Sequence, residues 1–164
     1  MEKNRTSGIG IFLFILLIIV IIGVILLLVW NTKKSPFVYF QQNTTEKYLV
    51  MATGVAVTSV PTNNTQWSIF KPDPTKEAYA ILNLSKLPNG NYLGYTTAVD
   101  GTELKPLTTY TEDTAGWVFS GISGTLIQPS GATTLSLFPT ATSVILKTSA
   151  DVTDGSNLFS INPT

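Results

Sequence analysis

The stretch Asn89-Gly90-Asn91-Tyr92-Leu93 decides the fold of this chain, because its Tyr-Leu pair recurs at a regular interval. Tyr48-Leu49 stands 44 residues before that pair, and Thr134-Leu135 stands 42 residues after it. Each pair begins a short apolar stretch after a polar turn, as β-strands often do. Self-similarity at a period of ~20–50 residues indicates a repeat architecture, and the three pairs predict three structural units.

A second series of markers closes each unit with an aromatic residue. It comprises Trp67-Ser68-Ile69-Phe70, Trp117-Val118-Phe119 and Phe159-Ser160-Ile161, whose starts are 50 and 42 residues apart. The interval from first to second marker is 19, 25 and 25 residues, so the three units are of similar size. A unit of ~40 residues with four short strands cannot bury its apolar face alone, so the three units must share one core.

Short β-branched and aromatic stretches fill the chain from Ser35 onward, and no window there has apolar residues at helical spacing for three turns. Turn residues separate these stretches, as in Pro61-Thr62-Asn63-Asn64 and Asp154-Gly155. We therefore expect an all-β domain with strands over 37–41, 47–52, 54–59, 66–70, 78–84, 91–96, 117–120, 125–128, 134–138, 143–147 and 158–161.

The repeated pattern resembles the β-trefoil family. Asn89-Gly90-Asn91-Tyr92-Leu93, leading to Val99-Asp100-Gly101, is most similar to the fascin and fibroblast-growth-factor form of the trefoil repeat. The resemblance covers residues 36–164 and implies a β-trefoil domain, with a β-sandwich or jelly roll as the alternative. The ricin-type lectin form would carry Gln two positions before each closing Trp. Thr65 and Ala115 stand there instead, which argues against sugar binding of the ricin kind.

An apolar run precedes this domain. Residues 8–30, GIGIFLFILLIIVIIGVILLLVW, carry no charged side chain, and a helix needs ~20 such residues to cross a bilayer. The run exceeds the ~7–15 apolar residues of a signal peptide and lacks its cleavage motif. We therefore expect a basic tail over 1–7, a transmembrane helix over 8–30, a linker over 31–35 and a β-trefoil-like domain over 36–164. Lys3 and Arg5 favour a cytoplasmic N-terminus for a single-pass membrane protein.

The composition excludes several functions. Ten basic and ten acidic residues give a net charge of zero, so nucleic acid is not an expected partner. The chain has no His and no Cys, which removes the usual zinc site, the Cys nucleophile and the Ser-His-Asp relay. We expect no enzyme activity, no cofactor and no metal.

Acidic side chains are the remaining acid-base candidates. A glycosidase needs two carboxylates that face one sugar, one of them with a raised pKa. The closest pairs in the sequence are Glu112 with Asp113, Asp73 with Glu77, and Asp100 with Glu103. All lie in polar, turn-like stretches, where carboxylates usually cap loops. A Ser85-Lys86 dyad is adjacent in sequence, but nothing predicts a buried lysine there, so no catalytic, metal or ligand-binding residue is assigned.

Two function classes remain. The first is a non-enzymatic structural protein that links a membrane, through residues 8–30, to neighbouring proteins, with loops 71–76 or 100–106 as contacts. The layout resembles minor capsid and membrane proteins of large DNA viruses with an internal membrane, which implies a virion membrane and capsid partners. The second is a membrane-anchored lectin or receptor-binding module with carbohydrate as ligand, because the trefoil resemblance implies three similar pockets.

Overall fold

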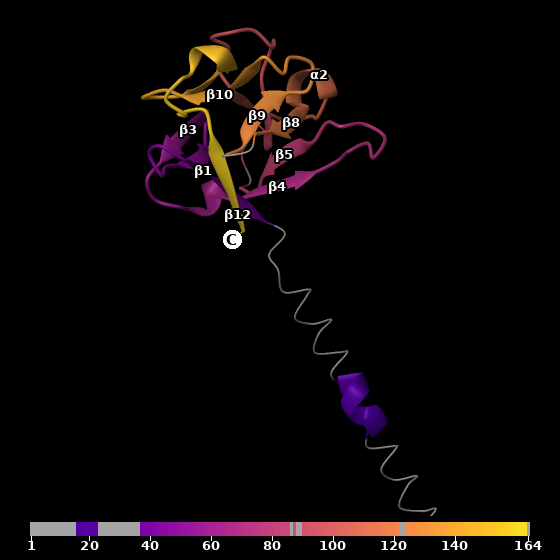
Figure 1. Ribbon diagram of the computed structural model, residues 1–164. Coiled ribbons are helices and arrows are strands. Elements are labelled where there is room, and N and C mark those ends of the chain that lie inside the picture. The colour runs from indigo at the N-terminus through magenta and orange to yellow at the C-terminus, as the bar shows by residue number, and fades with distance from the viewer. Residues whose placement is uncertain (1–15, 23–36, 86, 88–89, 122–123, 164) are drawn as a thin grey trace, which may run out of the picture. The chain divides into compact units, whose positions relative to one another are not determined.

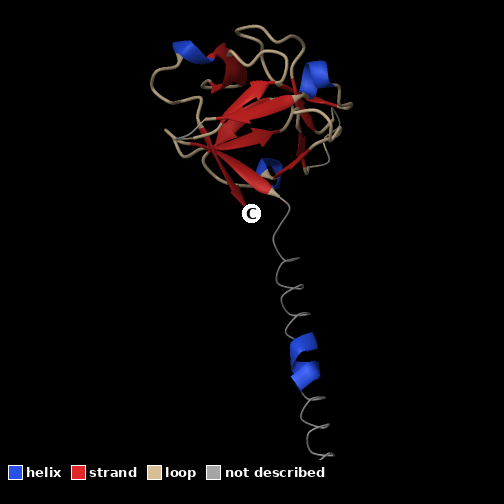
Figure 2. Ribbon diagram, turned by 45° about the vertical axis from the view of Figure 1, so that its right-hand side comes forward, coloured by secondary structure: helices blue, strands red, loops and turns tan. Residues whose placement is uncertain are grey.

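The computed structural model describes residues 16–22, 37–85, 87, 90–121 and 124–163 (Figure 1). Contacts between Cα atoms divide the chain into two compact parts, Met1–Ser35 and Pro36–Thr164. In the first part, residues 16–22 are helical and their side chains are exposed. The second part is built mainly of short strands and contains the three repeated units (Figure 2).

The single-pass membrane location expected from the sequence is wrong. Over the residues that the structure describes, no helix combines the length and the apolar character needed to cross a membrane. A span needs ~20 apolar helical residues, whereas the described helix covers 16–22. The rest of the expected span, the basic tail over 1–7 and the linker over 31–35 lie outside the described residues.

The strands of Pro36–Thr164 are three to five residues long, and some, such as Tyr48–Met51, alternate between buried and less buried positions, as the period of two along a β-strand predicts. In chain order they are β1 (Val38–Gln42), β2 (Tyr48–Met51), β3 (Val55–Thr58), β4 (Trp67–Phe70), β5 (Ala80–Asn83), β6 (Tyr92–Gly94), β7 (Lys105–Leu107), β8 (Trp117–Ser120), β9 (Leu126–Pro129), β10 (Leu135–Pro139), β11 (Val144–Thr148) and β12 (Phe159–Pro163). Three single-turn helices lie between them: η1 (Asn63–Thr65), α2 (Glu112–Ala115) and η2 (Ser149–Asp151).

Six of these strands form a closed antiparallel ring in the order β1-β4-β5-β8-β9-β12. The first and last strands of each unit meet at one residue pair: Val38 with Trp67, Tyr79 with Trp117, and Thr125 with Phe159. Longer hairpins join successive units through β4–β5 and β8–β9. Strands β12 and β1 pair over their full length and so close the ring.

The remaining strands form three hairpins, β2–β3, β6–β7 and β10–β11, one in each unit. A six-stranded ring with three hairpins in three-fold order is the β-trefoil arrangement, which confirms the expected fold. The alternative of a sandwich or jelly roll is wrong, because the ring closes on itself instead of splitting into two packed sheets.

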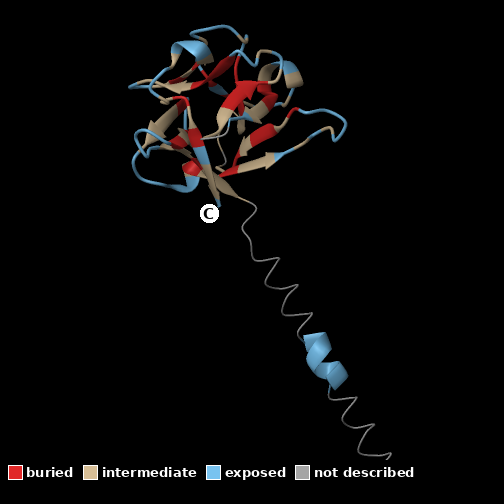
Figure 3. Cartoon of the chain, viewed as in Figure 1, coloured by how far each residue is buried: buried red, intermediate tan, exposed pale blue. Residues whose placement is uncertain are grey.

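The two series of sequence markers meet in the core, and Figure 3 shows the buried positions of the chain in red. Leu49, Leu93 and Leu135 are buried, and so are the closing residues Trp67, Trp117 and Phe159. The indole N–H of Trp67 donates to the Leu49 carbonyl at 3.1 Å, and that of Trp117 donates to the Leu93 carbonyl at 2.9 Å. The first and second markers of units one and two are thus joined by the same hydrogen bond.

One strand was missed in the sequence. β7 reads Lys-Pro-Leu, which lacks the β-branched and aromatic residues that usually identify a strand. Its central residue, Pro106, cannot donate a ladder hydrogen bond, and proline is tolerated at the edge of a sheet. β7 lies at such an edge, since its ladder runs to β6 alone.

Candidate functional site

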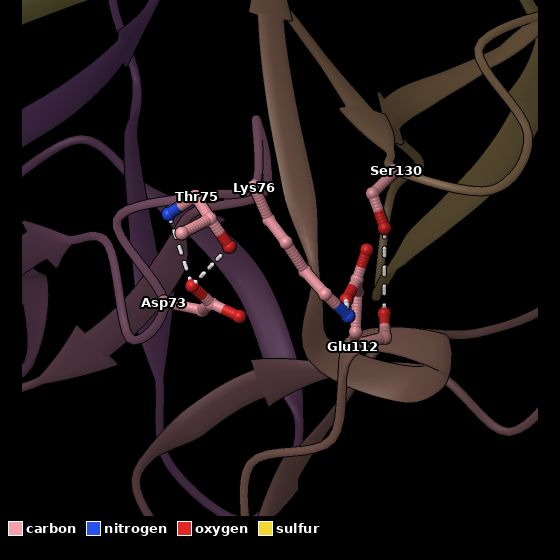
Figure 4. Close-up of polar contacts among 5 residues, drawn as sticks. All are labelled: Asp73, Thr75, Lys76, Glu112 and Ser130. Atoms are coloured by element: carbon pink, nitrogen blue, oxygen red, sulfur yellow. Dashed lines mark hydrogen bonds and ion pairs between the residues drawn. The ribbon is translucent and has the colours of Figure 1, made fainter.

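Two of the candidate carboxylates, Asp73 and Asp100, act as local structural groups. Asp73 accepts hydrogen bonds from the Thr75 backbone N–H at 2.9 Å and from its hydroxyl at 2.6 Å (Figure 4). Asp100 accepts the same two bonds from Thr148, at 3.1 and 2.7 Å. These donors favour the ionised form, so they hold the pKa of both carboxyls below its ordinary value. A glycosidase acid requires the opposite shift.

The glutamates of these pairs also have partners. Glu77 lies 3.4 Å from the Lys71 ammonium, and Glu112 pairs with Lys76, which joins the loop after β4 to α2 (Figure 4). The hydrogen bond to Glu112 raises the pKa of Lys76. Ser85 donates to the Asn64 side chain at 2.7 Å, while Lys86 lies outside the described residues. Within the described ranges, no group of three or more acidic side chains could hold a metal ion.

A polar pocket of about 670 Å³ lies where unit one ends and unit two begins, and we call it the junction pocket. Three of its lining residues, Asn63, Asn64 and Gln66, come from η1 and the residue before β4; the other three, Leu84, Ser85 and Leu87, follow β5. The β4–β5 hairpin brings them together, because Trp67 pairs with Asn83 and the Leu84 N–H donates to the Gln66 carbonyl at 3.1 Å.

Two features fix the wall of the junction pocket. Thr62 and Thr65 form a capping box around η1, in which the Thr62 hydroxyl accepts from the Asn64 N–H at 3.3 Å. Behind the wall, the buried amide of Asn83 donates to the Asn64 carbonyl at 2.8 Å and accepts from the Ser85 N–H at 3.0 Å. Since a buried amide is costly to leave unpaired, Asn83 ties both sides of the pocket to the core.

The described residues that line the junction pocket are neutral and mostly polar. Asn63 is exposed, and its side chain makes no hydrogen bond with the described residues. Gln66 donates to the Tyr39 hydroxyl at 3.4 Å, which leaves its carbonyl oxygen available. Leu84 and Leu87 add apolar surface, and no ionisable side chain of the described chain lines the pocket. A carboxamide is both donor and acceptor, so the site suits a neutral ligand rich in hydroxyl groups.

The junction between units three and one has an equivalent pocket of about 350 Å³. Gln42 pairs with the closing Phe159 as Asn83 pairs with Trp67, and its buried amide donates to the Ser156 carbonyl at 2.7 Å. Polar residues alone line this pocket, and Glu46 adds a carboxylate to it. It therefore lacks the apolar surface of the junction pocket.

The junction between units two and three differs from the other two. Pro129 pairs with the closing Trp117, so a side chain without an amide stands where Gln42 and Asn83 stand. The Ser130 N–H donates to the Gly116 carbonyl at 3.0 Å, and its hydroxyl donates to the Glu112 carbonyl at 3.4 Å (Figure 4). The three-fold pattern is therefore retained in the strand pairing, whereas the side chains at the three junctions differ.

Sequence reasoning missed the junction pocket. Asn63 and Asn64 were placed in a turn and Asn83 in the strand over 78–84, and none of them was assigned a ligand-binding role. The positions used to judge sugar binding, Thr65 and Ala115, are fully buried below the turns and do not line the pocket. The carboxamide side chains of Asn63, Asn64 and Gln66, just before Trp67, are a sequence signal for the site. The segment after β5 that faces them can be recognised only from the strand register.

The sequence matches no protein-family model and no curated protein. Among solved structures, it is similar to the designed three-fold symmetric protein ThreeFoil, with a TM-score of 0.64 and 11% identity over 77% of this chain and 98% of that one. A Polyporus squamosus lectin bound to Neu5Aca2-6Galb1-4GlcNAc has a TM-score of 0.62 and 18% identity, with 79% of this chain and 49% of that chain covered.

A third similar structure is a GlcNAcα1-4Gal-releasing endo-β-galactosidase from Clostridium perfringens. Its TM-score is 0.62 and its identity 14%, and the match covers 78% of this chain but 32% of the enzyme. Similarities at such low identity show the fold alone. Together with the closed ring and its three hairpins, they show that the larger part of this chain has a β-trefoil fold.

Proposed function

We propose that this protein is a non-enzymatic carbohydrate-binding module and that the junction pocket holds its ligand. The observation that carries the proposal is the neutral, carboxamide-lined surface of this pocket, which two units build together. The similar Polyporus squamosus lectin, with its bound saccharide, lends support at the level of the fold.

Each lining group has a role in this proposal. Asn63 and Gln66 present carboxamides, which can donate to one sugar hydroxyl while accepting from its neighbour. Leu84 and Leu87 offer apolar surface to the C–H face of a pyranose ring. Because the described lining residues offer carboxamides and apolar side chains, we expect a neutral saccharide as the ligand.

The other sequence-based function has less support. A structural link between a membrane and a protein layer depended on the membrane location, which the described helix contradicts. Catalysis is not carried over from the endo-β-galactosidase, since the match covers about a third of that enzyme. The candidate carboxylates Asp73 and Asp100 have lowered pKa values, which do not suit an acid catalyst.

A glycan array probed with the full chain tests the proposal, followed by calorimetric titration of the strongest neutral glycan. Gln66→Ala and Asn63→Ala should each weaken binding by about 2- to 10-fold, as the loss of one or two net hydrogen bonds predicts. Thr153→Ala is the matched control, because Thr153 is exposed and outside the pocket lining. Absence of any glycan hit, or equal affinity in all four proteins, would contradict the proposal.

A further inference from the structure

A second pocket, of about 390 Å³, lies where all three units meet, and we call it the tip pocket. The β2–β3 hairpin of unit one contributes the residues around Thr53 and Gly54. Unit two contributes Glu103 and Leu104 from the loop before β7, and unit three contributes Thr142 and Ser143 from the turn before β11. It shares no lining residue with the junction pocket.

Backbone pairing holds the walls of the tip pocket in place. The loop before β7 lies along β11, with the Leu104 N–H donating to the Val144 carbonyl at 2.9 Å and the Leu146 N–H donating to the Thr102 carbonyl at 2.8 Å. The turn before β11 is fastened by the Thr140 hydroxyl, which accepts from the Ser143 N–H at 3.1 Å. The tip pocket is therefore formed by ordered backbone before any ligand binds.

The lining combines one charge with an apolar floor. Val55 and Leu104 are buried beneath the pocket, and Val50 lies beside them. Glu103 is exposed and is the one ionisable side chain among the described lining residues. Its Oε1 atom accepts from the Ser143 hydroxyl at 3.2 Å, whereas Oε2 has no hydrogen bond or ion pair with the described residues.

The geometry points to a binding site for a small organic cation, a primary ammonium group on a short alkyl chain. The ammonium group has three donors and no acceptor, so it complements the carboxylate oxygen Oε2 and the hydroxyl of Thr142. Charge-assisted hydrogen bonds of this kind are stronger than neutral ones. The alkyl chain lies against Val50 and Ala56, which line the pocket and are partly exposed, since an exposed ion pair alone contributes little.

The test is a titration of the ¹⁵N-labelled full chain followed by two-dimensional NMR. Butylammonium chloride is the probe; 1-butanol replaces the charge with a hydroxyl, and methylammonium chloride removes the alkyl chain. Butylammonium should shift the backbone resonances of Thr53, Gly54 and Ser143, and it should bind at least about fivefold more tightly than either comparison compound, because only it offers both contacts.

Glu103→Gln should weaken butylammonium binding by at least about fivefold and leave 1-butanol binding unchanged. Asp151→Asn is the charge-matched control, because Asp151 is exposed, outside the pocket lining and without an ion pair in the described residues. Equal affinity of Glu103→Gln and the unaltered chain, or equal binding of butylammonium and 1-butanol, would overturn the inference. Glycan binding at the junction pocket is independent of both outcomes.

Discussion

The closing aromatic residue of each unit has two separable roles, core volume and a hydrogen bond. Trp67 and Trp117 fill the core and donate to a leucine carbonyl in the same unit. Phe159 fills the equivalent position without a donor. The trefoil core therefore accommodates a closing ring that has no N–H donor.

Substitutions at Trp67 should separate these roles. Trp67→Phe removes the donor to Leu49 and should lower the free energy of unfolding by about 1–3 kcal/mol, because a buried carbonyl loses its partner. Trp67→Ala also removes the ring and should cost about 3–5 kcal/mol. Urea unfolding of both variants measures the difference. If the two variants were equally stable, the ring would not belong to the core.

Asp100 makes the stability depend on pH at the acidic end. Hydrogen bonds from Thr148 lower the pKa of Asp100 in the folded state, so its stabilising contribution is present above the unfolded pKa of ~3.9 and is lost as the pH falls through the folded value. Asp100→Asn should be less sensitive to acid between about pH 5 and about pH 2. Melting temperatures over this range test it, and parallel curves for both proteins would contradict the assigned role.

The residues that sequence reasoning identified are those with a repeated hydrophobic role. Leu49 and Trp67 recur in kind because the core demands apolar bulk at the same place in every unit. The junction residues do not recur, since Asn83, Gln42 and Pro129 occupy one structural position with different chemistry. No periodic pattern can therefore identify them.

At the scale of elements, the strand pattern was predictable wherever β-branched and aromatic residues alternate. The strand predicted over 66–70 corresponds to β4, and that predicted over 117–120 coincides with β8. β7 was missed because Lys-Pro-Leu has no such signal, and its position depends on pairing with β6. The junction pocket was missed for a related reason: register places Gln66 opposite Leu84, and register is not visible in local sequence.

Gly94 allows the β6–β7 hairpin to pack closely against its surroundings. A Cβ atom at this buried position would lie 2.2 Å from a Leu107 side-chain carbon and 2.8 Å from the Thr114 carbonyl oxygen. Gly94→Ala should therefore destabilise the protein by about 1–3 kcal/mol through overpacking. Urea unfolding provides the measurement.

Gly131→Ala is the matched control for Gly94, because nothing lies within 4 Å of an added Cβ atom there. It should change the free energy of unfolding by less than about 0.5 kcal/mol. A Gly94→Ala variant as stable as this control would show that the hairpin has room that the structure does not indicate.

At the scale of the whole molecule, the terminal strands of the trefoil domain close its ring. β12 pairs with β1 from Val38 opposite Pro163 to Gln42 opposite Phe159. Contacts also separate Pro36–Thr164 from the preceding residues. We expect residues 36–164 to fold on their own, whereas residues 36–158 should fail to fold because they lack β12 and the buried Phe159. Circular dichroism and cooperative urea unfolding of the two fragments test this, and a stable 36–158 fragment would contradict ring closure as a requirement.

Whole-molecule features divide into those that the repeat predicted and those that it did not. Three units with one core follow from the Tyr-Leu and aromatic markers. The membrane expectation rested on composition over 8–30, and the described helix at 16–22 does not support it. Whether the ligand is a protein or a carbohydrate could not be predicted from the sequence, because the answer depends on which side chains line a pocket between two repeated units.

The most direct test of carbohydrate binding at the junction pocket is a two-dimensional NMR titration of the ¹⁵N-labelled chain with the strongest neutral glycan from the array. Such spectra report the side-chain amide groups of Asn and Gln individually. The account predicts that the largest changes occur at the side-chain amides of Asn63 and Gln66 and at the backbone N–H of Ser85. Changes confined to other residues, with these three signals unmoved by a saturating glycan, would contradict it.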